Sequence, residues 1–120
     1  MTPQAPSVGA AGSLTSGAAD AVITGASIAA ASLPQGVYEV LVTTYQVGTV
    51  DTNYTNMVVQ KKPSGAATDL HVVPSTAVPT TIFLPRVELN GSTGLQVAAD
   101  AASPGASSVY VAVITATRIG

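Results

Sequence analysis

Hydrophobic and polar positions alternate along most of this chain with the two-residue period of β-strands. The clearest stretch is Val37–Val47, which is rich in Val, Thr and Tyr, follows Pro34 and Gly36, and stops at Gly48. Further strands are predicted at Ala21–Thr24, Asn56–Lys61, Asp69–Val73, Thr80–Leu84 with Arg86–Leu89, Leu95–Ala99 and Ser108–Gly120. Turn residues separate these stretches at intervals of roughly ten residues. The pattern predicts an all-β fold, an antiparallel β-sandwich or jelly-roll-like barrel of seven to eight strands with an extended N-terminal arm.

Three short segments interrupt this pattern. Ser27–Leu33 is predicted as a strand or irregular segment, with a short helix as the alternative, because Pro34 and Gly36 end it early. Pro85 has no backbone N–H and therefore predicts an edge strand or a bulge. Asn90–Gly91 predicts a hairpin turn, which the following residues lengthen.

The last predicted strand is apolar on both faces. One face would carry Val109, Val111 and Val113, and the other would carry Tyr110, Ala112, Ile114 and Ala116. Only one face of a strand meets the core of a two-sheet sandwich. Another copy, a partner or the chain's own arm must therefore cover the second face. We expect this interface at Tyr110, Ala112 and Ile114, with the valine face as the alternative.

The first nineteen residues are dominated by Gly, Ala, Ser, Thr and Pro, with isolated larger apolar residues at Val8 and Leu14. Such a segment buries too little surface to order itself. We predict a flexible arm over residues 1–19 and a β-sandwich domain over residues 20–120. The arm is either an unstructured tail or a segment that orders on a neighbouring subunit through Val8 and Leu14.

Composition bears on what the surface does. The chain has 120 residues, enough for one domain, and 8% of them are charged, against about 25% in ordinary domains. Hydrophobic residues make up 47%, most of them small. A surface so poor in charge indicates an assembly subunit, and a secreted β-domain with a Ser/Thr surface is the alternative. The chain has no Cys, which leaves the redox compartment open.

Charge and hydropathy argue against several partners. The net charge is −2 and the one basic pair is Lys61–Lys62, so nucleic-acid binding is not expected. No apolar run reaches the ~18 residues of a membrane span. The N-terminus lacks the basic and apolar regions of a secretory signal, and we expect an unprocessed cytosolic translation product.

The chemistry-bearing residues do not form a recognisable catalytic motif. His71 is the single histidine, and a triad with Asp69 or Asp100 would match by chance among so many serines. Glu39 and Glu88 are the sole candidates for a glycosidase pair. Asp51 begins a D-x-N sequence that lacks the remaining calcium ligands. We therefore predict no catalytic residue, no metal site, no cofactor and no enzymatic activity.

Aromatic residues bear on an alternative function, a carbohydrate-binding or adhesin-like β-sandwich module associated with a tail or fibre. Such modules present exposed rings, and this chain has no Trp. An exposed cluster of Tyr38, Tyr45 or Tyr54 would favour the alternative, whereas packing of these rings against neighbouring strands would not.

The chain resembles small virion proteins of tailed bacteriophages, most of all capsid decoration (cement) proteins. The likeness rests on the Ala/Gly/Pro-rich arm at 1–19, on GVYEVLVTTYQVG at 36–48, and on NGSTGLQVAADAASPGASSVYVAVITATRI at 90–119. It implies a structural subunit that binds a major capsid protein on the capsid surface, forms homotrimers and is made in the host cytoplasm. Tail-tube, head–tail connector and fibre-associated domains share the same style.

Overall fold

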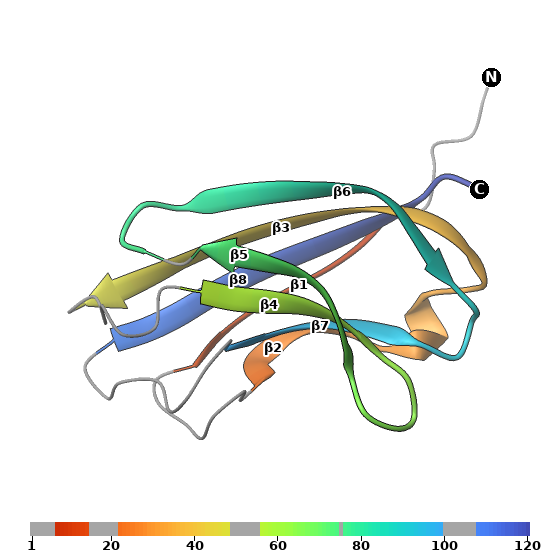
Figure 1. The fold of residues 1–120 in the computed structure, drawn as a ribbon, viewed down its shortest axis with the longest axis horizontal. Helices are drawn as coiled ribbons and strands as arrows, with labels where there is room; N and C mark the ends of the chain where they lie inside the picture. Colours follow the sequence, from red (N-terminus) through yellow and green to blue (C-terminus); the bar gives the residue numbers. More distant parts are fainter. Residues whose placement is uncertain (1–6, 15–21, 49–55, 75, 100–107) are drawn as a thin grey trace.

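The computed structural model describes residues 7–14, 22–48, 56–74, 76–99 and 108–120 (Figure 1). The described part contains eight strands and one short 3-10 turn. The strands are β1 (Ser7–Leu14), β2 (Val22–Ile28), β3 (Gly36–Gly48), β4 (Asn56–Lys62), β5 (Thr68–Pro74), β6 (Thr80–Leu89), β7 (Gly94–Ala99) and β8 (Ser108–Arg118). The turn, Ala30–Ser32, lies within Ser27–Leu33, for which the sequence predicted a strand or irregular segment with a short helix as the alternative. No helix in the described segments has the length and apolarity to cross a membrane.

The strands form a jelly-roll-like β-sandwich of two antiparallel sheets, which confirms the predicted all-β fold. Along the hydrogen-bonded order β5-β4-β7-β2-β1-β8-β3-β6, the first four strands make one sheet and the last four make the other (Figure 1). A single register pair, Ser13 with Thr24, joins β1 to β2. The chain therefore turns the corner between the two sheets at this pair.

The core lies between the sheets and takes alternate residues from each strand. On β8 the inward side chains Tyr110, Ala112, Ile114 and Ala116 are fully buried. In the register of the sheet, Ile114 lies between Ala10 on β1 and Val42 on β3. The opposite sheet contributes Ile23, Met57, Val59, Val73, Leu95 and Val97 to the same cluster.

The predicted arm needs correction, because Ser7–Leu14 is a strand within the sandwich. All eight residues pair with β8, from Ser7 opposite Thr117 to Leu14 opposite Tyr110. Val8 and Leu14 are partly buried and pack against the core of their own copy. Backbone pairing along the full strand supplies the order that its small side chains alone do not. Residues 1–6 and 15–19 of the predicted arm lie outside the described residues.

Pro85 lies at a bulge on an edge strand, as its missing N–H predicted. The register between β3 and β6 shifts between Tyr38–Val87 and Val40–Leu84, so that Pro85 and Arg86 together oppose Glu39. The strand continues across this bulge instead of ending at it.

The predicted hairpin at Asn90–Gly91 is wrong. β6 and β7 belong to different sheets, so the turn carries the chain across the sandwich. The Asn90 carboxamide oxygen accepts hydrogen bonds from the Ser92 N–H at 2.9 Å and from the Thr93 hydroxyl at 3.0 Å. Gly91 takes φ +87°, a conformation that glycine adopts without strain. The same residues that favour a hairpin therefore build an Asx-type turn between sheets.

A buried threonine ties the two sheets together at the side away from β1 and β2. The Thr44 hydroxyl on β3 donates to the backbone oxygen of Pro74 on β5 at 2.6 Å, and Thr44 is fully buried. The Gln46 N–H donates to the Thr76 oxygen close by at 2.7 Å. The first bond joins two strands that are not neighbours in a sheet, and the second joins β3 to the segment between β5 and β6.

We expect Thr44→Val to lower the free energy of unfolding by about 1–2 kcal/mol, because it leaves the Pro74 oxygen without its buried donor while preserving shape. The matched control is Thr43→Val, since the Thr43 hydroxyl bonds Thr81 in an exposed position and its loss should cost less than about 0.5 kcal/mol. Urea unfolding of both variants checks the difference, and equal costs would show that the buried bond adds nothing.

Candidate interaction surface

The second apolar face of β8 lies on the outside of the sandwich. Tyr110, Ala112 and Ile114, the expected interface residues, are fully buried in the core and cannot contact another molecule. Val109, Val111 and Val113 therefore point outward, and Val113 is 38% exposed. The alternative face named from the sequence is the one available to a partner.

Neighbouring strands extend this apolar surface across the whole sheet. In register, Val113 lies between Ala11 on β1 and Thr43 on β3, and Thr115 lies beside Leu41. Leu41 in turn pairs with Phe83 on the edge strand β6. We call this surface the outer face and define it by its outward residues: Gly9, Ala11, Ser13, Leu41, Thr43, Tyr45, Val47, Thr81, Phe83, Val109, Val111, Val113 and Thr115.

The outer face leaves large hydrophobic side chains open to solvent. Leu41 is 46% exposed, Val47 50% and Phe83 51%. The residues that define the outer face are uncharged, and the next outward residue on β3, Glu39 opposite Thr117, begins the charged end of the sheet. These exposed apolar side chains, with the hydroxyl residues Thr43, Tyr45 and Thr81 between them, make the outer face a candidate site of contact with another molecule.

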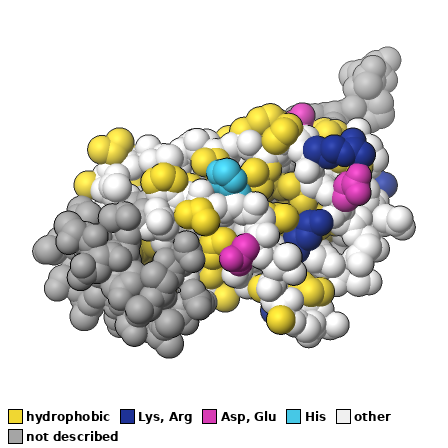
Figure 2. Space-filling view, in the orientation of Figure 1, with side chains coloured by type: hydrophobic (Ala, Val, Ile, Leu, Met, Phe, Trp, Pro, Cys, Tyr) yellow, Lys and Arg dark blue, Asp and Glu magenta, His cyan; other side chains and the backbone are white. Residues whose placement is uncertain are grey.

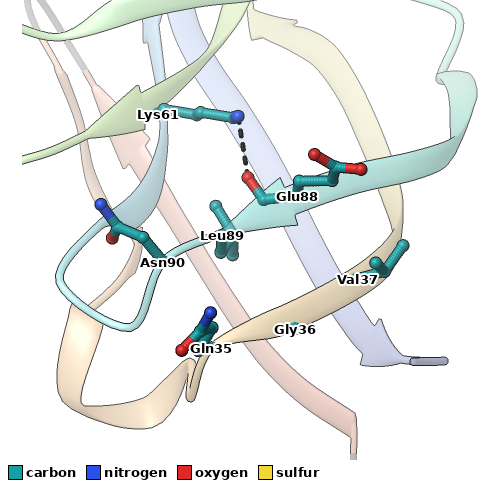
Figure 3. A pocket seen from close by; sticks show the side chains of 7 residues that line it. All are labelled: Gln35, Gly36, Val37, Lys61, Glu88, Leu89 and Asn90. Carbon is teal, nitrogen blue, oxygen red and sulfur yellow. Dashed lines mark hydrogen bonds between the residues drawn. The ribbon is translucent and has the colours of Figure 1, made fainter.

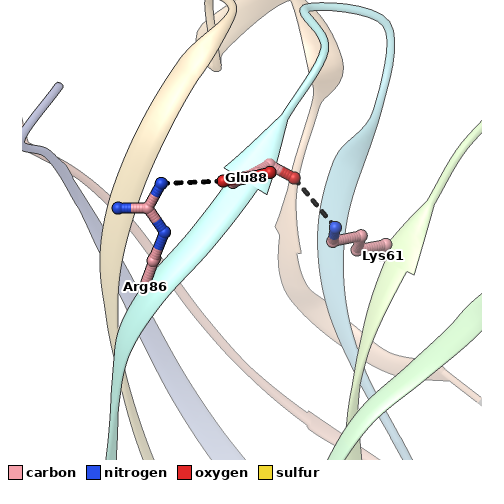
Figure 4. A network of polar contacts seen from close by, with 3 residues as sticks. All are labelled: Lys61, Arg86 and Glu88. Atoms are coloured by element: carbon pink, nitrogen blue, oxygen red, sulfur yellow. Dashed lines mark hydrogen bonds and ion pairs between the residues drawn. The ribbon is translucent and has the colours of Figure 1, made fainter.

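Charged side chains begin where the outer face ends. On β6 the Arg86 guanidinium donates to the Glu88 carboxylate at 2.8 Å, and both side chains are 68% exposed (Figure 4). From the opposite sheet, the Lys61 ammonium donates to the backbone oxygen of Glu88 at 2.8 Å. Figure 2 shows Lys and Arg side chains gathered at the end of the view where β4 and β6 terminate. The charged side chains thus form a charged end of the sheet that adjoins the uncharged face.

A pocket of about 470 Å³ opens at this charged end (Figure 3). It is lined by Gln35, Gly36, Val37, Lys61, Glu88, Leu89 and Asn90. Its polar groups are one ammonium, two carboxamides and one carboxylate, and the ammonium already donates to the Glu88 backbone. This set offers hydrogen bonds but pairs no nucleophile with a base.

The residues considered for catalysis are placed apart or engaged elsewhere. His71 is exposed on β5, and the Asp69 carboxylate accepts a hydrogen bond from the Gln60 amide at 2.8 Å. Within the described segments no three His, Asp or Glu side chains gather as a metal site would require. Asp51 and Asp100 lie outside the described residues.

Glu39 and Glu88, the candidate glycosidase pair, lie on the neighbouring strands β3 and β6. Glu88 is held by Arg86 in the exposed ion pair described above.

Tyr38 and Tyr45, the candidate tyrosines that the structure describes, do not form the exposed cluster that would favour a carbohydrate-binding module. Tyr38 is buried, and its hydroxyl donates to the Pro34 oxygen at 2.6 Å. Tyr45 is half-buried on the outer face beside Val111. Tyr54 lies outside the described residues.

Sequence reasoning missed Leu41 and Phe83 as surface residues. Both stand in strands where hydrophobic side chains occupy the two faces, so the pattern does not tell inside from outside. One signal was available. Leu41 pairs with Thr115 on β8 and with Phe83 on β6, and hydroxyl residues in these two strands favour an accessible face.

The fold is shared with solved structures of low sequence identity. The chain aligns with the PRD1 vertex protein P5 over 99% of its own length and 100% of that chain, at 17% identity and TM-score 0.54. It aligns with the Eiger TNF from S. frugiperda over 96% and 94%, at 14% identity and TM-score 0.63. It also aligns with a chain of the capsid of Helicobacter pylori bacteriophage KHP30 over 96% and 90%, at 16% identity and TM-score 0.50. No family model and no curated protein sequence matches the chain.

Proposed function

We infer that this chain is a non-enzymatic virion structural protein, a capsid decoration (cement) subunit that binds the capsid surface and stabilises the shell. The observation that carries the proposal is the uncharged apolar outer face on a small jelly-roll-like sandwich. The presence of a phage vertex protein and a phage capsid chain among structures with this fold supports it. Both alignments span nearly the whole chain.

The proposed work of the protein is mechanical. A decoration subunit acts through many weak contacts that are repeated over a symmetric shell, and repetition raises the total affinity without a strong single site. A surface with few charges suits such contacts, since fewer charges must lose their water when the surfaces meet. The partner in this proposal is the major capsid protein, and the place of action is the capsid surface after synthesis in the host cytoplasm.

The proposed oligomer is a homotrimer, and closed symmetric assemblies are the usual form of such subunits. The proposal assigns no cofactor, no metal and no nucleic-acid contact to the chain. In this proposal the exposed ion pair between Arg86 and Glu88 is structural and not catalytic.

Co-sedimentation with capsid shells lacking this protein tests the proposed function. We expect the chain to pellet with the shells in a fixed ratio to the capsid protein, and to raise the temperature at which the shells open. Shells of an unrelated phage serve as the control. Failure to bind shells that carry its own major capsid protein would contradict the proposal.

A ligand-binding β-sandwich module is the second candidate, and one observation favours it. A polar row crosses three strands of the opposite sheet, where the buried Gln96 donates to Gln60 and Gln60 donates to the exposed Asp69, each at 2.8 Å. Amides and carboxylates of this kind bond sugar hydroxyls. Binding on a glycan array that is lost in Gln60→Ala would support this candidate, and no binding would remove it.

A further inference from the structure

The outer face is not uniform, because its side chains differ in size from one edge to the other. Its β1 part carries Gly9, Ala11 and Ser13, whose side chains are absent or small. Its β3 and β6 part carries Leu41 and Phe83, paired with each other in register. The side chains therefore project little from the sheet on β1, which we call the low half, and project furthest on β3 and β6, which we call the high half.

We propose that a second copy of this chain covers the outer face, with the high half of one copy seated on the low half of the next. A two-fold axis running along the strands between two facing sheets places β6 of each copy over β1 of the other. A three-fold ring makes the same contact from each copy to its neighbour. The inference rests on the proposed function and deepens it: it assigns the outer face to the contact between copies in the proposed oligomer and leaves the contact with the capsid protein to other surfaces of the assembled subunits.

Charge supports a copy of the same chain as the occupant. The defined residues of the outer face are uncharged, and Glu39, the next outward residue on β3, lies at the end of the sheet opposite Thr117, so two such faces meet with their charges at the rim and not in the centre. A surface rich in charge, as most protein surfaces are, would lose hydration against this face and gain no ion pair. The Arg86–Glu88 pair at the border stays in solvent at the rim, where charged residues of interfaces are found.

The size of the face fits one specific interface. β1, β8, β3 and β6 contain 8, 11, 13 and 10 residues, and strands rise about 3.3 Å per residue and lie about 4.8 Å apart, which gives this side of the whole sheet, its charged end included, roughly 650 Å². In a two-fold pair, two such sheets bury about 1,300 Å² together with the charged end as the rim, near the lower limit of the range of about 1,200–2,000 Å² for stable complexes. A single copy therefore offers enough surface here without any other contact.

Light scattering on the purified full chain, over a range of concentrations, tests the inference. We expect the wild type to have the mass of two or more copies. Phe83→Lys should raise the dissociation constant at least tenfold, because it places a charge on the high half. Ala11→Phe should weaken association similarly, because a large ring fills the low half on which the neighbouring copy sits. Val72→Lys, at an exposed position on β5, is the matched control and should leave the mass unchanged.

Ala11→Phe separates shape complementarity from simple stickiness. If the outer face were only a hydrophobic patch, the added ring would strengthen association, and that result would overturn the inference. A wild type of single-copy mass at high concentration, or equal effects of Phe83→Lys and Val72→Lys, would also overturn it. Thermal melts of each variant show that it is folded. A monomer that still binds capsid shells would contradict this inference alone, whereas an oligomer that binds none would contradict the proposed function alone.

Discussion

Ile114→Ala is expected to destabilise the protein by about 2–5 kcal/mol, the cost of removing a large aliphatic side chain from a packed core. Ile114 is fully buried on β8, in register with Ala10 on one side and Val42 on the other. Because the free energy of unfolding of a small domain is only about 5–15 kcal/mol, this one change removes a large share of the total stability.

The neighbouring residue provides the matched control. Val113 points the other way and is 38% exposed, so Val113→Ala should cost less than about 1 kcal/mol in a single copy. Urea unfolding at a protein concentration low enough to separate the copies gives both values. If Ile114→Ala left unfolding unchanged and abolished association, the two faces of β8 would have been assigned the wrong way round.

Gly25→Ala is the second large expected effect. Gly25 has φ +88°, and a Cβ built there would lie 2.9 Å from the Ala11 backbone oxygen and 3.3 Å from the Gly12 Cα. The left-handed conformation costs a side chain about 1–2 kcal/mol, and the contacts are with backbone that cannot rotate away. We therefore expect a loss of about 2 kcal/mol or more and a fall in Tm of roughly 8 °C.

Gly25 matters because of where it lies. The register of β2 with β7 shifts between Val22 and Ser27, and Thr24 within this segment is the residue that pairs with β1. The glycine thus allows β2 to turn from one sheet to the other while lying against β1. Gly65→Ala is the control, since a Cβ at Gly65 meets nothing within 4 Å, and its stability should be unchanged or slightly raised. Equal melting temperatures for the two variants would contradict this account of the corner.

Much of the fold could be predicted from the sequence because its strands carry strong local signals. Val37–Val47 is rich in β-branched residues and is bounded by Pro and Gly, and both features favour a strand that begins and ends there. It lies within β3. Ser7–Leu14 gave no such signal. Its alternation of Val8, Ala10 and Leu14 inward with small residues outward is present, but side chains of that size do not specify a strand, and the pairing partner lies about a hundred residues away on β8.

The sequence predicts that a candidate surface exists on β8, but it does not predict which face of the strand forms it. Two apolar faces on β8 require that something cover one of them, and that argument needs no structure. Which face turns inward depends on packing across the sandwich, where Tyr110, Ala112 and Ile114 meet the opposite sheet in one cluster. No local pattern distinguishes that row from the valine row beside it.

The central claim is that another copy of the chain covers the outer face, and thiol protection tests it most directly. The chain has no Cys, so Val113→Cys and Val72→Cys each introduce a single thiol, at positions that are 38% and 45% exposed in one copy. We expect the thiol at position 113 to react with a maleimide at least tenfold more slowly in the concentrated native protein than after dilution, while the thiol at position 72 reacts at one rate throughout. Equal rates at both positions and at both concentrations would contradict the account.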